Sequence, residues 1–178
     1  MQQIVFTFVG NDKPGLVQRL SEQVSAHGGN WLESRLARMA GKFAGIVCIN
    51  VPASNAAALQ ATLQQLTDDG LTVTLEYSEA RSARGDQHGL IAVLGNDRPG
   101  IVHEVASALA NRQINIEELS SKVESAPMAG IPLFSAHIRV ALPASLDLGE
   151  LQEQLDEIAN QLDLDISLEL NANREISA

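Results

Sequence analysis

One short stretch of this chain occurs twice. It reads Gly10-Asn11-Asp12-Lys13-Pro14-Gly15-Leu16-Val17 in the first half and Gly95-Asn96-Asp97-Arg98-Pro99-Gly100-Ile101-Val102 in the second. The offset is 85 residues (95 − 10), and the same offset carries Asn30 onto Asn115. Solenoid repeats are much shorter than this period. The duplication therefore predicts two folded domains in tandem.

The hydrophobic pattern around the repeated stretch predicts the same order of elements in both halves. Strands are expected at 2–9, 30–39, 42–51 and 71–76, and helices at 14–27 and 54–68, with Ser54 as N-cap of the second helix. The last helix of the second half carries an apolar stripe made of Leu148, Leu151, Leu155, Ile158 and Leu162. Each half is thus predicted to be a β-α-β-β-α-β unit, an α+β fold of the ferredoxin-like type with an antiparallel sheet.

A polar segment separates the two halves. Residues 79–88 contain Arg, Ser and Gly and are predicted to be a linker between domains at 1–78 and 89–172. Charge is unevenly divided. Residues 1–86 hold 7 basic and 8 acidic residues, net −1, whereas residues 87–178 hold 5 and 14, net −9. The second domain is therefore expected to carry nearly all of the acidity.

The overall charge and the apolar runs exclude several kinds of partner. A formal net charge of −10 repels DNA, RNA and anionic membrane surfaces. No apolar run is long enough to span a bilayer, and the N-terminal stretch lacks the pattern of a signal peptide. Cys48 is the single cysteine and is interpreted as a buried, inert thiol. We expect a cytoplasmic protein with neither nucleic-acid nor membrane partners.

The repeated loop joins a strand to a helix, and its composition indicates an anion site. Asp12 or Asp97 is expected to cap free N–H groups of the helix, with proline in the first turn and glycine leaving room for a ligand or another backbone. Exposed N–H groups and the helix dipole favour an anion such as the carboxylate of a free amino acid. Asparagines at the loop and at the next strand could bind its ammonium or carboxylate group.

The pattern strand, Asn-Asp-x-Pro-Gly, helix, followed by asparagine at a strand start, resembles the ACT domain, a regulatory module that binds amino acids. In that resemblance the ligand lies at an interface between ACT domains, near the loop and the asparagine that opens the second strand. Carried onto this sequence, with the loop asparagines added from their chemistry, the ligand-binding positions are Asn11, Asp12, Pro14, Gly15, Asn30, Asn96, Asp97, Pro99, Gly100 and Asn115. The sequence leaves open whether these domains pair within one chain, between two chains of a homodimer, or both.

Two copies of the module and little else resemble the family of glycine cleavage system transcriptional repressors. That resemblance implies a small amino acid as ligand, glycine first, and repression of glycine cleavage genes by contact with an activator protein rather than DNA. The alternative is an ACT-domain regulatory subunit or amino-acid sensor of another metabolic pathway. Neither reading requires a cofactor.

Two other classes of protein share this topology, but the sequence lacks the residues that their chemistry requires. An RNA-recognition module needs stacking aromatics and a basic sheet, whereas aromatic residues make up only 3% of this chain. An acylphosphatase-like enzyme needs a phosphate-cradling arginine, and Arg98 has only Lys13 as its counterpart. The four histidines show no metal-ligand spacing and no catalytic partner. No catalytic residue and no metal site are expected.

Overall fold

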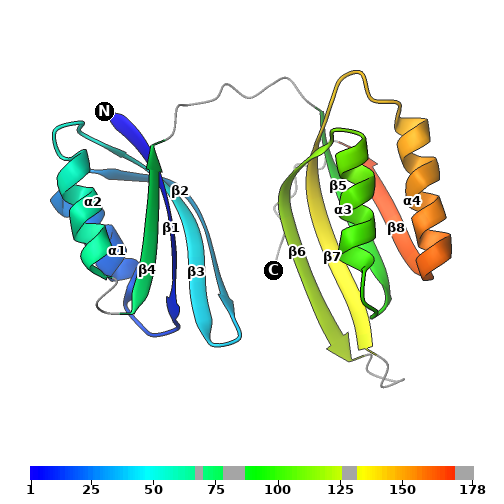
Figure 1. Cartoon of the computed structure of the whole chain (residues 1–178), viewed down its shortest axis with the longest axis horizontal. Coiled ribbons are helices and arrows are strands. Elements are labelled where there is room, and N and C mark those ends of the chain that lie inside the picture. The colour runs from blue at the N-terminus through cyan, green and yellow to red at the C-terminus, as the bar shows by residue number, and fades with distance from the viewer. Residues whose placement is uncertain (67–69, 78–86, 126–131, 171–178) are drawn as a thin grey trace. The chain divides into compact units, whose positions relative to one another are not determined.

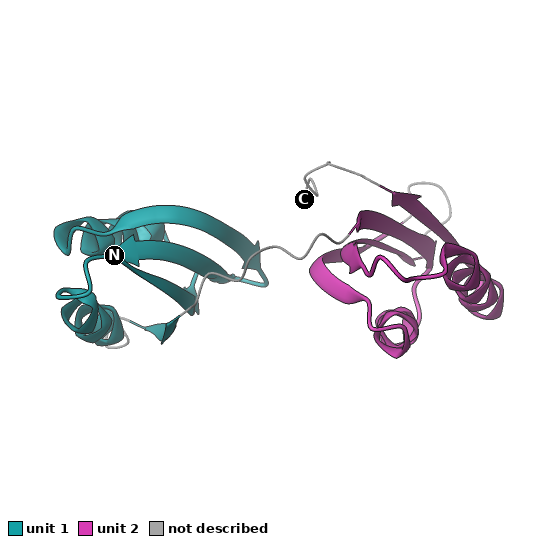
Figure 2. Ribbon diagram, turned by 90° about the horizontal axis from the view of Figure 1, so that it is seen from above, with its two compact units in different colours: residues 1–82 teal, residues 83–178 magenta. Residues whose placement is uncertain are grey.

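The computed structural model describes residues 1–66, 70–77, 87–125 and 132–170. They belong to two compact units, Met1–Ser82 and Ala83–Ala178 (Figure 2). In each unit two helices lie on one face of a four-stranded antiparallel sheet (Figure 1). Both units therefore have the predicted ferredoxin-like arrangement. No helix in the described ranges is long and apolar enough to cross a membrane.

The first unit has its strands in the order β2-β3-β1-β4. Its elements are β1 (Gln2–Asn11), α1 (Leu16–Ala26), β2 (Asn30–Met39), β3 (Lys42–Val51), α2 (Ala56–Gln65) and β4 (Leu71–Tyr77). The predicted β2–β3 hairpin is confirmed, because its turn is made by Ala40 and Gly41, with φ angles of 49° and 77°. Two successive residues at positive φ are typical of the tight turns that match the twist of paired strands.

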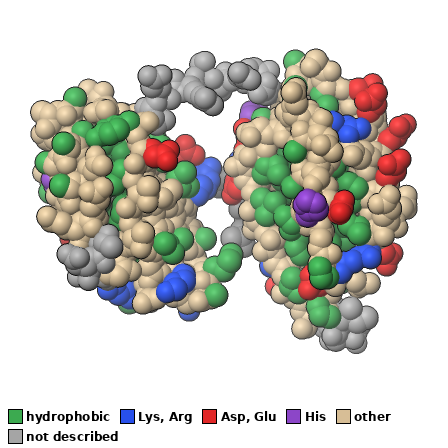
Figure 3. All heavy atoms as spheres, viewed as in Figure 1, with side chains coloured by type: hydrophobic (Ala, Val, Ile, Leu, Met, Phe, Trp, Pro, Cys, Tyr) green, Lys and Arg blue, Asp and Glu red, His purple; other side chains and the backbone are tan. Residues whose placement is uncertain are grey.

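The second unit repeats this topology with the order β6-β7-β5-β8. Its elements are β5 (Gln87–Asn96), α3 (Ile101–Asn111), β6 (Asn115–Ser125), β7 (Pro132–Leu142), α4 (Leu148–Leu162) and β8 (Leu164–Leu170). The helix α4 differs most from its counterpart α2. It exposes Glu150, Glu153, Asp156 and Glu157, whereas α2 has no charged residue. Acidic side chains accordingly gather along the α4 side of this unit (Figure 3).

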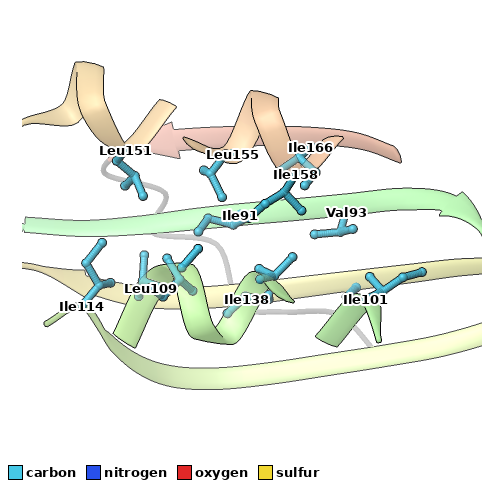
Figure 4. Packing of buried hydrophobic residues seen from close by; sticks show 14 of the residues in the cluster. Ile91, Val93, Ile101, Leu109, Ile114, Ile138, Leu151, Leu155, Ile158 and Ile166 are labelled. Atoms are coloured by element: carbon cyan, nitrogen blue, oxygen red, sulfur yellow. The ribbon is translucent and has the colours of Figure 1, made fainter. Parts of the chain in front are cut away.

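Each unit has its own hydrophobic core between the sheet and the two helices. In the first unit the core is centred on Phe6, Leu20 and Leu59, each 0% exposed. In the second unit Leu151, Leu155 and Ile158 of α4 pack over the inner face of the sheet, as the apolar stripe predicted (Figure 4). The two clusters share no residue. Each unit thus has the buried apolar surface of a separate folding domain.

Three sequence expectations need correction. The N-cap of α2 is Asn55, not Ser54, whose hydroxyl instead donates to the Asn55 side chain at 3.1 Å. The prediction placed Gln87 and His88 in the linker, but they open β5 and pair with β7. Their exposed side chains made them look like linker, although strand pairing needs only their backbone groups. Residues 79–86 of the predicted linker lie outside the described residues.

Cys48 is the third correction, because its thiol is only partly buried. It alternates along β3 with the fully buried Val47 and Ile49, so it lies on the sheet face that the helices do not cover. Its sulfur accepts a hydrogen bond from Gln3 Nε2 at 3.0 Å. The apolar sequence around it hid this alternation between the two faces.

Candidate ligand-binding loops

The two repeated loops adopt the same backbone conformation, and glycine decides it. Gly15 caps α1 with φ of 87°, and Gly100 caps α3 with φ of 101°. Neither helix has a side-chain capping bond, so the prediction that Asp12 or Asp97 caps the helix is wrong. Each proline directly precedes the glycine cap, so it lies just outside the helix and not in the first helical turn as predicted. The first N–H groups of both helices thus have no side-chain cap, which is the condition under which a helix start favours an anion.

The glycines in the repeated stretch have two different physical roles. A Cβ atom added at Gly15 or Gly100 would meet nothing within 4 Å, so these residues are required for their left-handed backbone. At Gly95 a Cβ atom would lie 2.5 Å from Leu164 Cδ2 and 3.0 Å from the Asp163 carbonyl oxygen. That glycine therefore permits β8 to pass close to β5. Both roles are structural and need no bound ligand.

In the first unit, two cationic side chains of the β2–β3 hairpin bind the polar side chains of the loop. Arg38 Nε lies 2.7 Å from Asp12 Oδ2, and Lys42 Nζ donates to Asn11 Oδ1 at 2.6 Å. The backbone N–H of Asp12 donates to the Gly41 carbonyl at 2.9 Å. The hairpin turn therefore holds this loop by three bonds and neutralises its carboxylate.

The second unit has the same loop without these cations. Strand register places Val123 where the first unit has Arg38, because both residues pair with equivalent phenylalanines, Phe134 and Phe43. Leu133 likewise replaces Lys42 opposite the loop asparagine. Within the described ranges, the side chains of Asn96 and Asp97 have no hydrogen-bonding or ionic partner. The two copies of one motif thus stand in different electrostatic surroundings.

Arg98 is a further polar group at the second loop, and sequence reasoning gave it no role in binding. Its Nε atom is buried and has no hydrogen-bond partner in the structure. The corresponding Lys13 of the first unit is exposed. A buried donor without a partner is costly unless something accepts from it, and a guanidinium matches a carboxylate well. The repeat comparison could have drawn attention to this position, since Arg98 is the one non-identical residue within the Asn-Asp-x-Pro-Gly motif.

A shallow hollow lies beside the first loop. It has a volume of about 300 Å³, enough for a free amino acid, and is open to solvent. It is lined by Asp12, Lys13, Gly15, Leu16, Val17, Gln18 and Phe43. Of the predicted loop residues, Asp12 and Gly15 line this hollow, whereas Asn11 and Pro14 do not.

The predicted strand-start asparagines do not lie beside the loop of their own unit. Asn30 pairs with Asn50 on β3, whereas loop residue Asn11 pairs with Lys42 at the other end of that strand. Eight residues of extended strand separate Asn50 from Lys42, a distance of about 26 Å. Asn115 stands apart from the second loop in the same way, opposite Ala141. In each unit α1 or α3 carries the chain back along the sheet and causes this separation.

The fold and the loops together define the class of protein. The chain belongs to the ACT-domain family: ACT-domain models match residues 2–76 and residues 89–160. Among curated relatives, it is 23% identical over 161 residues to the glycine cleavage system transcriptional repressor of Escherichia coli (strain K12). That similarity covers 89% of this chain and 85% of the relative. Over 78 residues it is 35% identical to a UPF0237 protein of Methanopyrus kandleri, covering 43% of this chain and 80% of that relative.

Two solved structures match this chain over nearly its whole length. A crystal structure of an unknown protein from Galdieria sulphuraria matches with a TM-score of 0.85 and 30% identity, covering 95% of this chain and 98% of that one. A second structure, of a protein proposed to be a glycine cleavage system transcriptional repressor, matches with a TM-score of 0.71 and 25% identity. It covers 97% of this chain and 98% of its own. The chain is thus an ACT-domain protein related to glycine cleavage repressors.

Proposed function

We propose that this chain is a non-enzymatic, cytoplasmic regulator that responds to a small amino acid, with glycine as the first candidate. Its membership in the ACT-domain family and its similarity, over 89% of the chain, to a glycine cleavage system transcriptional repressor support this proposal. The two uncapped helix starts, each preceded by an Asn-Asp pair, supply the chemistry for a zwitterionic ligand. An ACT-domain regulatory subunit or sensor for another pathway is the alternative.

The loop of the second unit is the better binding site of the two. A free amino acid carries an ammonium and a carboxylate, and the site must pair both. Asp97 and Asn96 are available to the ammonium, whereas their counterparts in the first unit already bind Arg38 and Lys42. The first N–H groups of α3 have no side-chain cap, and Arg98 has a buried Nε without a partner, so both offer donors for the carboxylate. The unpaired state of this cluster is the observation that carries the proposal.

Glycine should raise the melting temperature of the protein in a concentration-dependent way, because a ligand that binds only the folded state stabilises it. Asp97→Ala should abolish that rise. Asp12→Ala is the matched control and should keep it, since the exposed ion pair with Arg38 contributes little stability. Differential scanning fluorimetry with the twenty common amino acids, followed by calorimetric titration of any that respond, measures both effects.

The outcomes of this screen separate the parts of the proposal. A protein whose melting temperature responds to no amino acid is not an amino-acid sensor. A response to another amino acid favours the alternative pathway over glycine cleavage. Loss of the response in Asp12→Ala, with retention in Asp97→Ala, would place the ligand at the first loop instead.

We further propose that repression works through contact with an activator protein, to which the acidic second unit contributes. Glu150, Glu153 and Glu157 lie exposed on α4, where α2 has no charge, so they can steer a basic partner. Pull-down with the activator of a glycine cleavage operon should weaken as salt rises. Changing these three residues to glutamine should weaken it further, whereas the same change at Glu22, Glu33 and Glu76 of the first unit should not.

A gel-shift experiment tests the competing mechanism, in which the protein binds DNA directly. The protein alone should not retard the promoter fragment, because its charge of −10 repels the DNA phosphates. Specific retardation by the purified protein would show direct DNA binding. Failure of the activator to associate both with and without glycine would remove the partner from the proposal.

A further inference from the structure

A hollow on the surface of the second unit lies where the end of α3 meets α4. Its volume is about 380 Å³, and it is open to solvent. It is lined by Arg112, Glu150, Glu153, Gln154 and Glu157. The four residues from α4 are spaced i, i+3, i+4 and i+7, so they form one stripe along the helix. Every lining side chain is charged or an amide, and the hollow therefore suits a charged group with hydrogen-bond donors or acceptors.

The hollow carries more negative charge than its own cation balances. Three carboxylates and one guanidinium line it, a net charge of −2 (1 − 3). The Arg112 guanidinium donates from Nη2 to the backbone carbonyl of Glu150 at 3.1 Å. Within the described residues it forms no ion pair with the three carboxylates. Like charges three or four residues apart on one helix face repel one another, so the stripe destabilises α4 unless a cation approaches it.

One acceptor in the lining of the hollow is buried. The Oε1 atom of Gln154 is inaccessible to solvent and has no hydrogen-bond partner in the described part of the chain. A buried acceptor without a donor lowers the stability of the fold. The carboxylates beside it accept hydrogen bonds but do not donate them, and the Arg112 Nη2 atom already donates to Glu150. The donor that this oxygen lacks can therefore be supplied by a partner molecule.

The first unit shows that the fold does not require an acidic hollow at this place. His27 caps the end of α1 as Arg112 caps the end of α3, 85 residues later. Its ring Nε2 lies 3.4 Å from Thr62 Oγ1 on α2, and α2 has no charged residue. The same pair of helices thus packs without any carboxylate on the second one. The acidic stripe of α4 is therefore not a packing requirement of the fold.

We propose that this hollow receives an arginine side chain of the partner protein, an inference that rests on the activator contact proposed above. A guanidinium presents five N–H donors in a planar fork, so it can donate to the Gln154 oxygen and to neighbouring carboxylates at once. Its charge offsets part of the repulsion along α4. Lysine has the same charge, but its ammonium is compact and more strongly hydrated. The hollow therefore selects arginine over lysine.

A peptide of three arginines, acetylated and amidated, tests this selection without the activator. In an NMR titration of the full chain, it should shift the side-chain amide signal of Gln154. The equivalent peptide of three lysines should bind more weakly at equal charge. Glu153→Gln should weaken binding of the arginine peptide by about tenfold, because a charged hydrogen bond is lost. Glu169→Gln, the same change on the exposed face of β8, is the matched control and should leave binding unchanged. Equal affinity for the two peptides would overturn the proposal.

Gln154→Met separates binding from folding. Methionine is also unbranched but lacks the amide oxygen, so the melting temperature should stay the same or rise when the unpaired acceptor is removed. The variant should still bind the arginine peptide about tenfold more weakly. Unchanged binding by this variant contradicts the proposal, and if it melts at a lower temperature, Glu153→Gln still decides.

The peptide also separates this inference from the proposed function. If the arginine peptide does not bind but the activator is still pulled down, the arginine inference is wrong and the activator contact stands. If the peptide binds as expected and the activator does not associate, the hollow is an arginine site and the activator is not its partner. The response of the melting temperature to glycine is measured independently of both.

Discussion

Replacing Leu155 by alanine should strongly destabilise the second unit and leave the stability of the first unit unchanged. Leu155 is 0% exposed and lies in the middle of the α4 stripe that covers the sheet. Removing a buried leucine side chain costs about 2–5 kcal/mol, because the cavity left behind collapses only in part. Small domains are commonly stable by about 5–15 kcal/mol in all, so this loss is a large part of the total. Since the two cores share no residue, the free energy of unfolding of the first unit should not change.

Calorimetry of the full chain measures this separation. Leu155→Ala should lower the midpoint temperature of the transition in which the second unit unfolds. The transition of the first unit should keep its midpoint. Leu59→Ala, at an equally buried position of α2, is the matched variant and should lower the other transition. If both substitutions lowered a single shared transition to the same extent, the two units would be folding as one body.

Replacing Gly100 by alanine should destabilise the second unit even though no atom stands in the way of the new methyl group. A Cβ atom there would meet nothing within 4 Å, but the residue has φ of 101°. A left-handed backbone costs an ordinary L residue about 1–2 kcal/mol. For a domain of this size that corresponds to a melting temperature lower by about 4–8 °C for each kcal/mol. The decrease should appear without any amino acid present.

Asparagine is the conservative control at this position, because it tolerates the left-handed region better than alanine does. Gly100→Asn should therefore lose less stability than Gly100→Ala, and thermal denaturation of both without ligand compares them. An alanine variant that melts at or above the wild-type temperature would show that the loop relaxes to a conformation with negative φ. Any change in amino-acid response of these variants must be compared with this effect on the fold itself.

Alternating side chains and turn residues were sufficient to predict most of the fold. The β2–β3 hairpin has the predicted bounds, because both strands alternate and Ala40-Gly41 interrupts them. The apolar stripe of α4 likewise predicted its buried face. Helix starts were harder. In the stretch Asp-x-Pro-Gly, three residue types are each compatible with a helix start, and only the backbone angles show that glycine is the cap.

The candidate site was only partly predictable for a related reason. The loops themselves follow from the repeated sequence, but the difference between them comes from residues on neighbouring strands. Arg38 and Val123 are far from the loops along the chain, and strand register alone makes them equivalent. The same register separates Asn30 from Asp12 by the length of a strand. Sequence order places residues along one strand well, but it does not show which residues meet across strands.

The missing hairpin cations of the second unit have a consequence for how the chain could have diverged after duplication. Val123 and Leu133, both outside the motif, stand where the first unit has Arg38 and Lys42, so two positions are enough to leave the carboxylate and the amide unpaired while the motif stays the same. One copy can then keep a loop that is bound to its hairpin and has a structural role, while the other copy can acquire a new ligand specificity. The protein therefore contains its own internal comparison, since each property of the second loop can be measured against the same motif in the first unit.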